Sequence, residues 1–282
     1  MIILKHAAAV SSYIKSRKDA GLTIGFVPTM GALHQGHISL LNESKKLCNI
    51  TIMSIFINPT QFNSKEDFKK YPVTIENDIY LLEKNKCDIL FLPDVNEIYP
   101  DGIKSTENFD LGYLDTILEG QYRPGHFGGV CQVVKRLLEI THPTHLFLGQ
   151  KDYQQCMVIK KLLEIMHSSI DLQICETLRE PNGLAMSSRN ARLNEIQKEQ
   201  ALEIYNTLNS LKKNIVAGNL NTFKKKAIEH LLCKGFRPDY VEIADADNLH
   251  LLEKWNGKDD LVILIAAFLG DVRLIDNLTL TD

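Results

Sequence analysis

Two histidines three positions apart, in the stretch PTMGALHQGH, are the side chains of this chain best placed to do chemistry. His34 and His37 follow an apolar run and open a segment whose apolar residues recur at helical spacing. Residues three apart share one face of a helix, and a helix amino terminus favours an anion through its unpaired N–H groups. Gly31 and Gly36 allow the backbone to approach a ligand closely. The pattern predicts a phosphate site in which both imidazoles donate hydrogen bonds to oxygens whose charge grows in a transition state.

Two other interpretations of the histidine pair stay open at this level. The first is an ordinary helix-capping turn whose histidines are surface residues without a chemical role. The second is a metal site, which the sequence disfavours because it contains no H-E-x-x-H motif and suggests no third ligand nearby.

Polar side chains also follow three of the other apolar runs of the chain. Lysine, arginine and serine suit a triphosphate, because the cations neutralise its charge and the hydroxyls donate hydrogen bonds. Neutral glutamine amides both donate and accept, which suits a substrate that carries hydroxyls and a carboxylate. The residues in question are Asn58 and Gln61 in NPTQF, Lys151, Asp152 and Gln155 in GQKDYQQ, and Ser187, Ser188 and Arg189 in GLAMSSRN.

The elements that must position these residues alternate between strand and helix. Apolar β-branched runs predict strands, and apolar residues at helical spacing predict the helices between them. This alternation is typical of an α/β fold with a parallel sheet, in which ligands bind beyond the carboxyl ends of the strands. We expect strands at 23–29, 50–58, 87–93, 144–149 and 170–177, and helices at 37–47, 76–86, 128–141 and 153–166.

The pattern changes after about residue 186. Two polar, lysine-rich helices are expected at 195–217 and 221–234. Strands are expected at 239–245 and within 260–278, where the chain would fold back on itself at Gly270 and Asp271. The sequence therefore predicts two domains, a nucleotide- and substrate-binding domain at 1–177 and a smaller α+β domain at 178–282.

Composition limits the function classes that remain. A net charge of -3 over 282 residues gives no reason to expect nucleic acid or a membrane surface as partner. The longest apolar stretch, 261–270, has about half the length that a membrane-spanning helix needs. The start of the chain lacks the pattern of a signal peptide. Six scattered cysteines without a C-x-x-C pair predict reduced thiols in a cytoplasmic protein.

Five motifs in order, PTMGALHQGH, NPTQF, YRPGHFGGV, GQKDYQQ and GLAMSSRN, resemble those of the pantoate–β-alanine ligases. This family belongs to the nucleotidyltransferases with an H-x-G-H motif. The resemblance extends over essentially the whole chain and implies a Rossmann-like parallel-sheet domain of that type with a smaller C-terminal α+β domain. Gln35, Leu178 and Asn182 stand where the family often has glutamate, valine and aspartate.

The resemblance also implies the reaction and its participants. It is the ATP-dependent condensation of (R)-pantoate with β-alanine to pantothenate, through a pantoyl adenylate, with release of AMP and pyrophosphate. Magnesium is the implied cofactor, and the protein is expected to be a homodimer whose smaller domain acts as a lid. Another nucleotidylyltransferase of the H-x-G-H type that acts on a small metabolite remains an alternative, as does a non-catalytic nucleotide-binding module.

Site residues carry over from the family motif by motif. His37 is the implied proton donor, and His34, Lys151 and Arg189 are the other expected catalytic residues. Gln61 and Gln155 are expected to hold pantoate, and Asp78 to assist with magnesium. Asn58, Tyr71, Arg123 and His126 are expected either to complete the pocket or to support its loops. The expected ATP-binding residues are Met30, Gly31, Ala32, Leu33, His34, Gln35, Gly36, His37, Gly149, Gln150, Lys151, Asp152, Leu178, Met186, Ser187, Ser188 and Arg189.

Overall fold

A computed structural model describes residues 1–62, 65–103 and 108–280 of the chain. The chain divides into two compact units, one made of Met1–Gly149 with Val158–Glu176, the other of Gln150–Met157 with Thr177–Asp282. The second unit thus includes a short segment that precedes the last strand of the first. The division expected from the sequence, at 177 and 178, stays a prediction.

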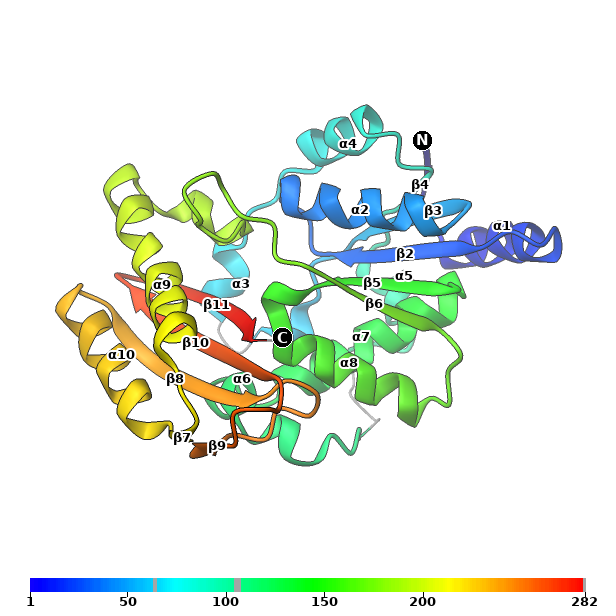
Figure 1. Ribbon diagram of the computed structural model, residues 1–282. Coiled ribbons are helices and arrows are strands. Elements are labelled where there is room, and N and C mark those ends of the chain that lie inside the picture. Colours follow the sequence, from blue (N-terminus) through cyan, green and yellow to red (C-terminus); the bar gives the residue numbers. More distant parts are fainter. Residues whose placement is uncertain (63–64, 104–107, 281–282) are drawn as a thin grey trace. The chain divides into compact units, whose positions relative to one another are not determined.

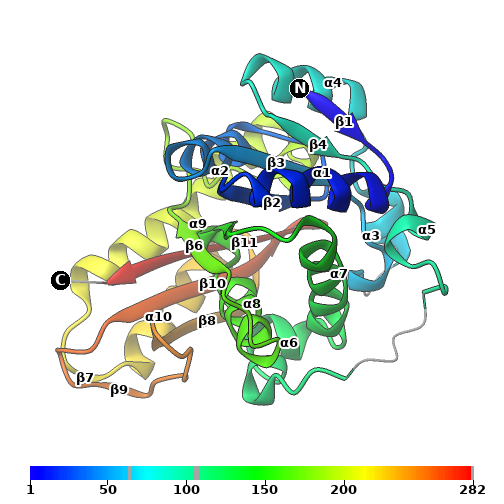
Figure 2. The same cartoon turned by 90° about the vertical axis from the view of Figure 1, so that its right-hand side faces the viewer.

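A parallel sheet of six strands forms the centre of the first unit. Its order is β1-β4-β3-β2-β5-β6, so the chain starts at one edge and then crosses to the middle (Figures 1 and 2). Five strands lie where the apolar runs predict them. The sequence analysis missed the edge strand β1. The strands are β1 (Ile2–Leu4), β2 (Ile24–Thr29), β3 (Ile50–Ile55), β4 (Ile89–Phe91), β5 (His145–Gly149) and β6 (Asp171–Cys175).

Helices cover both faces of this sheet. In Figure 1, α2 and α4 lie on one face and α7 on the other, where α1 packs against it. The sequence analysis also missed α1. The helices up to β6 are α1 (Ala7–Asp19), α2 (Gln35–Leu47), α3 (Lys65–Lys70), α4 (Ile75–Lys84), α5 (Val95–Ile98), α6 (Leu118–Tyr122), α7 (His126–Thr141) and α8 (Tyr153–Ile165), with short 3-10 turns η1 (Pro59–Gln61), η2 (Gly112–Asp115) and η3 (Gln150–Asp152).

The register of the central strands places the site loops. Thr29, at the end of β2, pairs with Ile55, at the end of β3. Both strands are buried over nearly their whole length, so their side chains serve the core and the residues that follow them are left for binding. The loop of residues 30–34 and the turn of residues 58–61 therefore leave the sheet at the same edge.

The core between the sheet and α2 depends on a close approach. Val27, Leu41, Met53 and Phe147 are fully buried in it. Gly25, in β2, has no side chain, and a Cβ there would collide with the Ser44 Oγ of α2. Glycine at this position lets the helix lie tightly over the strand, and that packing fixes where the amino terminus of α2 points.

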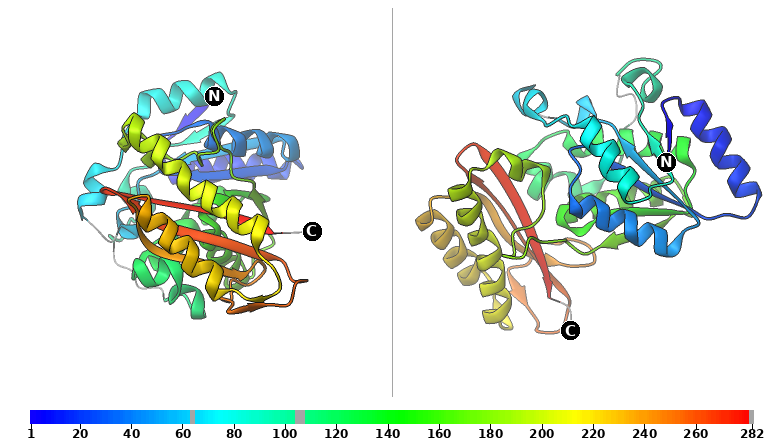
Figure 3. Two further views of the ribbon diagram at one scale, coloured as in Figure 1. Left: turned by 60° about the vertical axis from the view of Figure 1, so that its left-hand side comes forward. Right: turned by 90° about the horizontal axis from the view of Figure 1, so that it is seen from above.

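The second unit is built on an antiparallel sheet with the order β11-β10-β8. The tight turn at Gly270 and Asp271 joins β10 to β11, as the sequence predicts. Leu269 and Val272 pair on either side of this turn. Helices α9 and α10 lie side by side against this sheet (Figure 3). The expected fold class is confirmed. The elements are η4 (Ser188–Arg192), α9 (Glu195–Asn214), β7 (Gly218–Asn219), α10 (Asn221–Cys233), β8 (Arg237–Asp245), β9 (Lys254–Trp255), β10 (Leu261–Leu269) and β11 (Val272–Leu280).

Within residues 1–62, 65–103 and 108–280, the helices are too short or too polar to span a membrane.

The contact under α2 yields a stability prediction. Gly25→Ala should lower the free energy of unfolding by about 1–3 kcal/mol, because the added methyl group overpacks the interface with Ser44. Chemical denaturation measures this loss. The double variant Gly25→Ala, Ser44→Ala should recover part of it, since the colliding hydroxyl is gone. A single variant as stable as the parent would contradict the prediction.

Candidate active site

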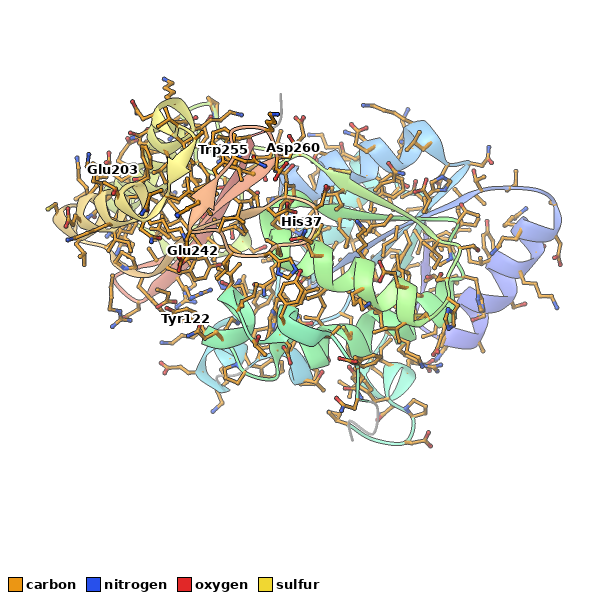
Figure 4. The ribbon with its side chains drawn as sticks, turned by 60° about the horizontal axis from the view of Figure 1, so that its bottom comes forward. His37, Tyr122, Glu203, Glu242, Trp255 and Asp260 are labelled. Carbon is orange, nitrogen blue, oxygen red and sulfur yellow. The ribbon has the colours of Figure 1, made fainter. Side chains whose placement is uncertain are left out.

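The two histidines cap the amino terminus of α2. His34 is the N-cap residue, and its Nδ1 accepts a hydrogen bond from the N–H of Gly36 at 3.1 Å. His37 Nδ1 accepts from the N–H of His34 at 3.3 Å, and the two ring centroids are 4.1 Å apart. Because Nδ1 is an acceptor in both neutral rings, the proton of each sits on Nε2. The capping arrangement therefore makes each Nε2–H a donor (His37 is labelled in Figure 4).

This capping explains why α2 begins earlier than predicted. The apolar spacing alone suggested a start at His37, whereas the helix starts at Gln35. Imidazole is a rare capping group compared with serine, threonine, asparagine and aspartate. A capping serine could satisfy the same N–H groups, so the choice of histidine at both positions points to a chemical use of Nε2.

A buried carboxylate holds the loop that leads into α2. Gly31 and Ala32 both have left-handed backbone conformations, with φ of 84° and 49°. Asp78, on α4, is 1% exposed, and its Oδ2 accepts from the N–H of Ala32 at 2.9 Å. Its Oδ1 accepts from the N–H of Leu33 at 2.8 Å and from the hydroxyl of Thr74 at 3.0 Å. The strained conformation of Ala32 is thus stabilised by a charge-assisted bond to its own N–H.

The contacts of Asp78 bear on the expected magnesium site. Both of its oxygens already accept hydrogen bonds, two of them from the main chain. Within the part of the chain that the structure describes, no group of three His, Cys, Asp or Glu side chains could hold a metal ion. These residues do not form a protein cage for a cation. The assignment of Asp78 to magnesium stays a prediction, while the observed contacts make it the residue that fixes the loop.

Gln61 lies beside the start of the same loop. Its Nε2 contacts Met30 Sδ at 2.6 Å as a hydrogen-bond donor, and its Oε1 accepts from Asn58 Nδ2 at 3.3 Å. The structure therefore brings together an amide expected to bind pantoate and a residue expected to bind ATP. Both atoms of the Gln61 amide group are oriented by these contacts.

Asn58 is the centre of the turn that carries Gln61. It is 1% exposed, donates to the carbonyl oxygen of Gly129 at 3.1 Å and accepts from the phenol of Tyr99 at 2.8 Å. Burial raises the pKa of Tyr99, although hydrogen bonds with Thr60 and Asn58 oppose the shift. The phenol therefore stays protonated and remains a donor to Asn58 at neutral pH.

His126 and Arg123 support the turn from another side. His126 is buried, and its ring forms a 2.8 Å hydrogen bond with the carbonyl oxygen of Gln61 through Nδ1. Arg123 Nη1 lies 3.1 Å from the other ring nitrogen and can only donate, so Nδ1 carries the proton and donates to Gln61. Tyr71 packs its ring against Phe62, directly after the turn, at 5.7 Å. These contacts show Tyr71, Arg123 and His126 supporting loops.

Apart from Gly149, the remaining expected site residues lie in the second unit. Gln150, Lys151 and Asp152 form η3, and Gln155 lies in the first turn of α8. Ser187 caps η4, accepting from the N–H of Arg189 at 3.3 Å, so its own hydroxyl proton remains a donor. Of the expected ATP-binding residues, 30–37 and 149 thus belong to the first unit, and 150–152, 178 and 186–189 to the second.

Sequence reasoning missed several residues that position these groups. Tyr99 and Thr74 lie outside the motifs, and no local pattern marks them as partners of Asn58 and Asp78. Gly129 did carry a signal, as the second glycine of a pair inside an apolar helix, where glycine is costly. Glycine is needed at this position because the Thr60 backbone approaches it closely.

The sequence profile described as Pantoate-beta-alanine ligase matches residues 2–279. The chain belongs to this family.

Relatives of the pantoate–β-alanine ligase family match along their full length. A protein of Leptospira interrogans named pantothenate synthetase is 43% identical over 100% of this chain and 99% of its own. The crystal structure of pantothenate synthetase from Thermus thermophilus superposes with a TM-score of 0.87 at 33% identity, covering 99% of both chains. A pantoate–β-alanine ligase from Francisella tularensis, complexed with βγ-ATP and β-alanine, has a TM-score of 0.83 at 38% identity and covers 99% of this chain and 97% of its own. The family expected from the five motifs is confirmed.

Two neighbouring glycines of α7 provide a matched test of the Gln61 turn. A Cβ at Gly129 would lie 2.9 Å from the Gln61 nitrogen and collide with the backbone of Thr60, whereas one at Gly128 has nothing within 4 Å. Gly129→Ala should therefore displace the turn and raise the Michaelis constant for pantoate about tenfold or more, as expected when a binding group moves by about 1 Å. Gly128→Ala should leave it near the parental value. Equal Michaelis constants in steady-state assays of the two variants would show that this turn does not hold pantoate.

Proposed function

We propose that the chain joins pantoate to β-alanine in an ATP-dependent reaction that passes through pantoyl adenylate and releases AMP and pyrophosphate. Membership of the pantoate–β-alanine ligase family supports this reaction. So does the likeness to the Francisella enzyme, which holds βγ-ATP and β-alanine. The observation that carries the mechanism is the pair of imidazoles at the start of α2, each with its Nε2 set as a donor by its own capping bond.

The first step is attack of the pantoate carboxylate on the α-phosphorus of ATP. A bond forms between a carboxylate oxygen and phosphorus, and the bond to the bridging oxygen breaks as pyrophosphate leaves. Negative charge grows on the phosphoryl oxygens, so fixed donors stabilise the transition state more than the bound substrate. His37 and His34 supply such donors through Nε2, and His37 takes the proton-donor role that the family resemblance implies.

Cations and hydroxyls of the second unit complete the set of donors. Lys151 and Arg189 neutralise phosphate charge, and Ser187 and Ser188 donate hydrogen bonds to phosphate oxygens. Phosphoryl transfer depends mainly on positioning and electrostatic stabilisation. These cations and hydroxyls contribute both. Magnesium belongs to this proposal too, and when bound it would add positive charge at the triphosphate.

In the second step the amine of β-alanine attacks the acyl carbon of the adenylate. An amide bond forms, the bond to the phosphate oxygen breaks, and AMP leaves, while the proton lost by the amine passes to a phosphate oxygen of the departing AMP. Gln61, with Gln155, orients pantoate by hydrogen bonds to its hydroxyls and carboxylate. The Gln61 amide is suited to this because Asn58 and Met30 fix the positions of its two polar atoms.

An acyl adenylate hydrolyses readily, so the reaction requires exclusion of water. The second unit, which carries the M-S-S-R segment, is the proposed lid. The proposal also includes a homodimer, which rests on the family resemblance. It includes a location in the cytoplasm, which rests on the scattered thiols.

Pyrophosphate exchange tests the order of the chemistry. Labelled pyrophosphate should enter ATP when pantoate and Mg²⁺ are present and β-alanine is absent, because the first step then reverses without amide formation. His37→Ala should lower the exchange rate about a hundred- to a thousandfold, the usual cost of losing one such donor. His230→Ala, a histidine of α10 paired with Glu203 (labelled in Figure 4), is the matched control and should exchange at the parental rate.

Product analysis separates this proposal from its rivals. AMP, pyrophosphate and pantothenate should form in equal amounts from ATP, pantoate and β-alanine, as measured by mass spectrometry. Stoichiometric ADP would overturn the adenylate mechanism. A product that retains the nucleotide would identify another nucleotidylyltransferase, and ATP binding without turnover would indicate a binding module.

A further inference from the structure

Strand β11 carries two adjacent buried polar residues. Asp276 is 5% exposed and Asn277 is 2% exposed, within the otherwise mostly apolar run LIDNL. Burial of polar groups is costly unless each finds hydrogen-bond partners. Consecutive residues of a strand point to opposite faces, so the two side chains reach different neighbours. Those neighbours are one segment expected to bind phosphate and the hairpin that leads into another.

Asn277 holds the segment that contains Lys151. Its Nδ2 donates to the carbonyl oxygen of Gln150 at 3.0 Å and to that of Lys151 at 2.9 Å. Its Oδ1 accepts from the Gln150 side chain at 3.3 Å. One amide thus fixes two consecutive peptide units of η3, and with them the direction in which the Lys151 side chain leaves the backbone.

Asp276 holds the hairpin that leads into the M-S-S-R segment. Its two carboxylate oxygens accept from Arg179 Nη1 at 2.6 Å and from Nη2 at 3.0 Å. The same guanidinium donates to the carbonyl oxygen of Gly183 at 3.2 Å and lies 4.2 Å above the ring of Tyr205. Arg179 is therefore held by an ion pair, a main-chain bond and an aromatic face, and it ties the first strand and the turn of the hairpin to β11.

Hydrogen bonds connect this hairpin to the residues that are proposed to bind phosphate. Arg179 pairs with Ala185 across the hairpin, and the N–H of Met186 donates to the carbonyl oxygen of Leu178 at 3.1 Å. Asn190 Nδ2 then donates to the carbonyl oxygen of Ala185 at 2.9 Å and closes η4 onto the hairpin. The residues between, Ser187 to Arg189, are thus bounded on both sides by bonds that lead back to Arg179.

We propose that Asp276 and Asn277 are positioning residues that hold the segments of Lys151 and Arg189 at a fixed spacing for phosphoryl transfer. The inference rests on the proposed function, which gives those two segments their phosphate-binding role. Both segments are attached to consecutive residues of one strand, and the N–H of Asn277 donates to Asp276 Oδ1 at 2.8 Å. Misplacement of a reacting or stabilising group by about 1 Å can cost about a hundredfold in rate, so this link has a direct kinetic consequence.

Two nearly isosteric exchanges test the link. Asn277→Asp replaces the donor Nδ2 by an oxygen that faces two carbonyl oxygens, and Asp276→Asn removes the charge that binds Arg179. Each should lower kcat/KM for ATP about ten- to a hundredfold in pyrophosphate exchange, while the Michaelis constant for pantoate changes much less. Asn277→Ala, which adds no charge, is the second variant in case Asn277→Asp does not fold.

Glu242→Gln is the matched control, because it breaks an ion pair of the same sheet. Glu242 lies on β8 (labelled in Figure 4) and pairs with Lys224 of α10 at 2.6 Å. Thermal unfolding should show a comparable loss of stability in the control and in the test variants. The control should keep the parental kcat/KM for ATP, since its partner lies outside both phosphate-binding segments. Test variants that are as active as the control would overturn the positioning role.

A mutant cycle with Lys151→Ala identifies the route. If Asn277 acts through Lys151, Asn277→Asp should add little further loss in the Lys151→Ala background, whereas Asp276→Asn should keep most of its effect. Fully additive losses for Asn277→Asp would overturn this route.

Direct titration of ATP separates this inference from the proposed function. Weaker ATP binding in both variants than in Glu242→Gln would support the positioning role even if the parent shows no pyrophosphate exchange, a result that would overturn only the adenylate reaction. Parental ATP affinity together with parental exchange in both variants would overturn the positioning role and leave the proposed reaction standing.

Discussion

The hold of Asp78 on the main chain of Ala32 and Leu33 is the constraint on which the first unit's site depends. The loop must leave β2 and turn within five residues into α2, and it does so through two consecutive left-handed residues. Only one of these is glycine, so the loop needs an outside partner to stay in this conformation. A carboxylate from α4 supplies it with bonds to two successive N–H groups. These two hydrogen bonds set the position of the histidine cap and, with it, the direction of both Nε2 atoms.

Much of this arrangement could be predicted from the sequence, because it depends on local patterns. The apolar runs predicted five of the six parallel strands, and the H-x-G-H spacing predicted the amino terminus of α2. The first strand and α1 escaped because Ile2–Leu4 is only three residues long and the helix after it buries only Val10 and Ile14. A run that short is below the length at which periodicity distinguishes strand from loop.

Hydrogen-bond partners that lie far apart in the chain could not be predicted from the sequence. Asn277 lies 126 and 127 positions from the carbonyl groups that it binds, and Asp276 lies 97 positions from Arg179. No period or motif connects residues so far apart, and only the fold brings them together. Asp78 illustrates the same limit in another way. The family resemblance directed attention to its charge and to magnesium, whereas the contacts show its acceptor atoms used on the backbone of the neighbouring loop.

One side of the turn around Gln61 is held by side chains without formal charge, while Arg123 and His126 support its other side. Tyr99, Asn58, Gln61 and Met30 form a connected set, and burial keeps the phenol protonated well above neutral pH. Such a set has the same hydrogen-bond pattern across the whole physiological pH range, since none of its members gains or loses a proton there. This part of the hold on Gln61 is thereby insensitive to acidification. Among the contacts described for this turn, a pH-dependent change can therefore enter only through the His126 ring, whose Nδ1 bonds the Gln61 carbonyl oxygen.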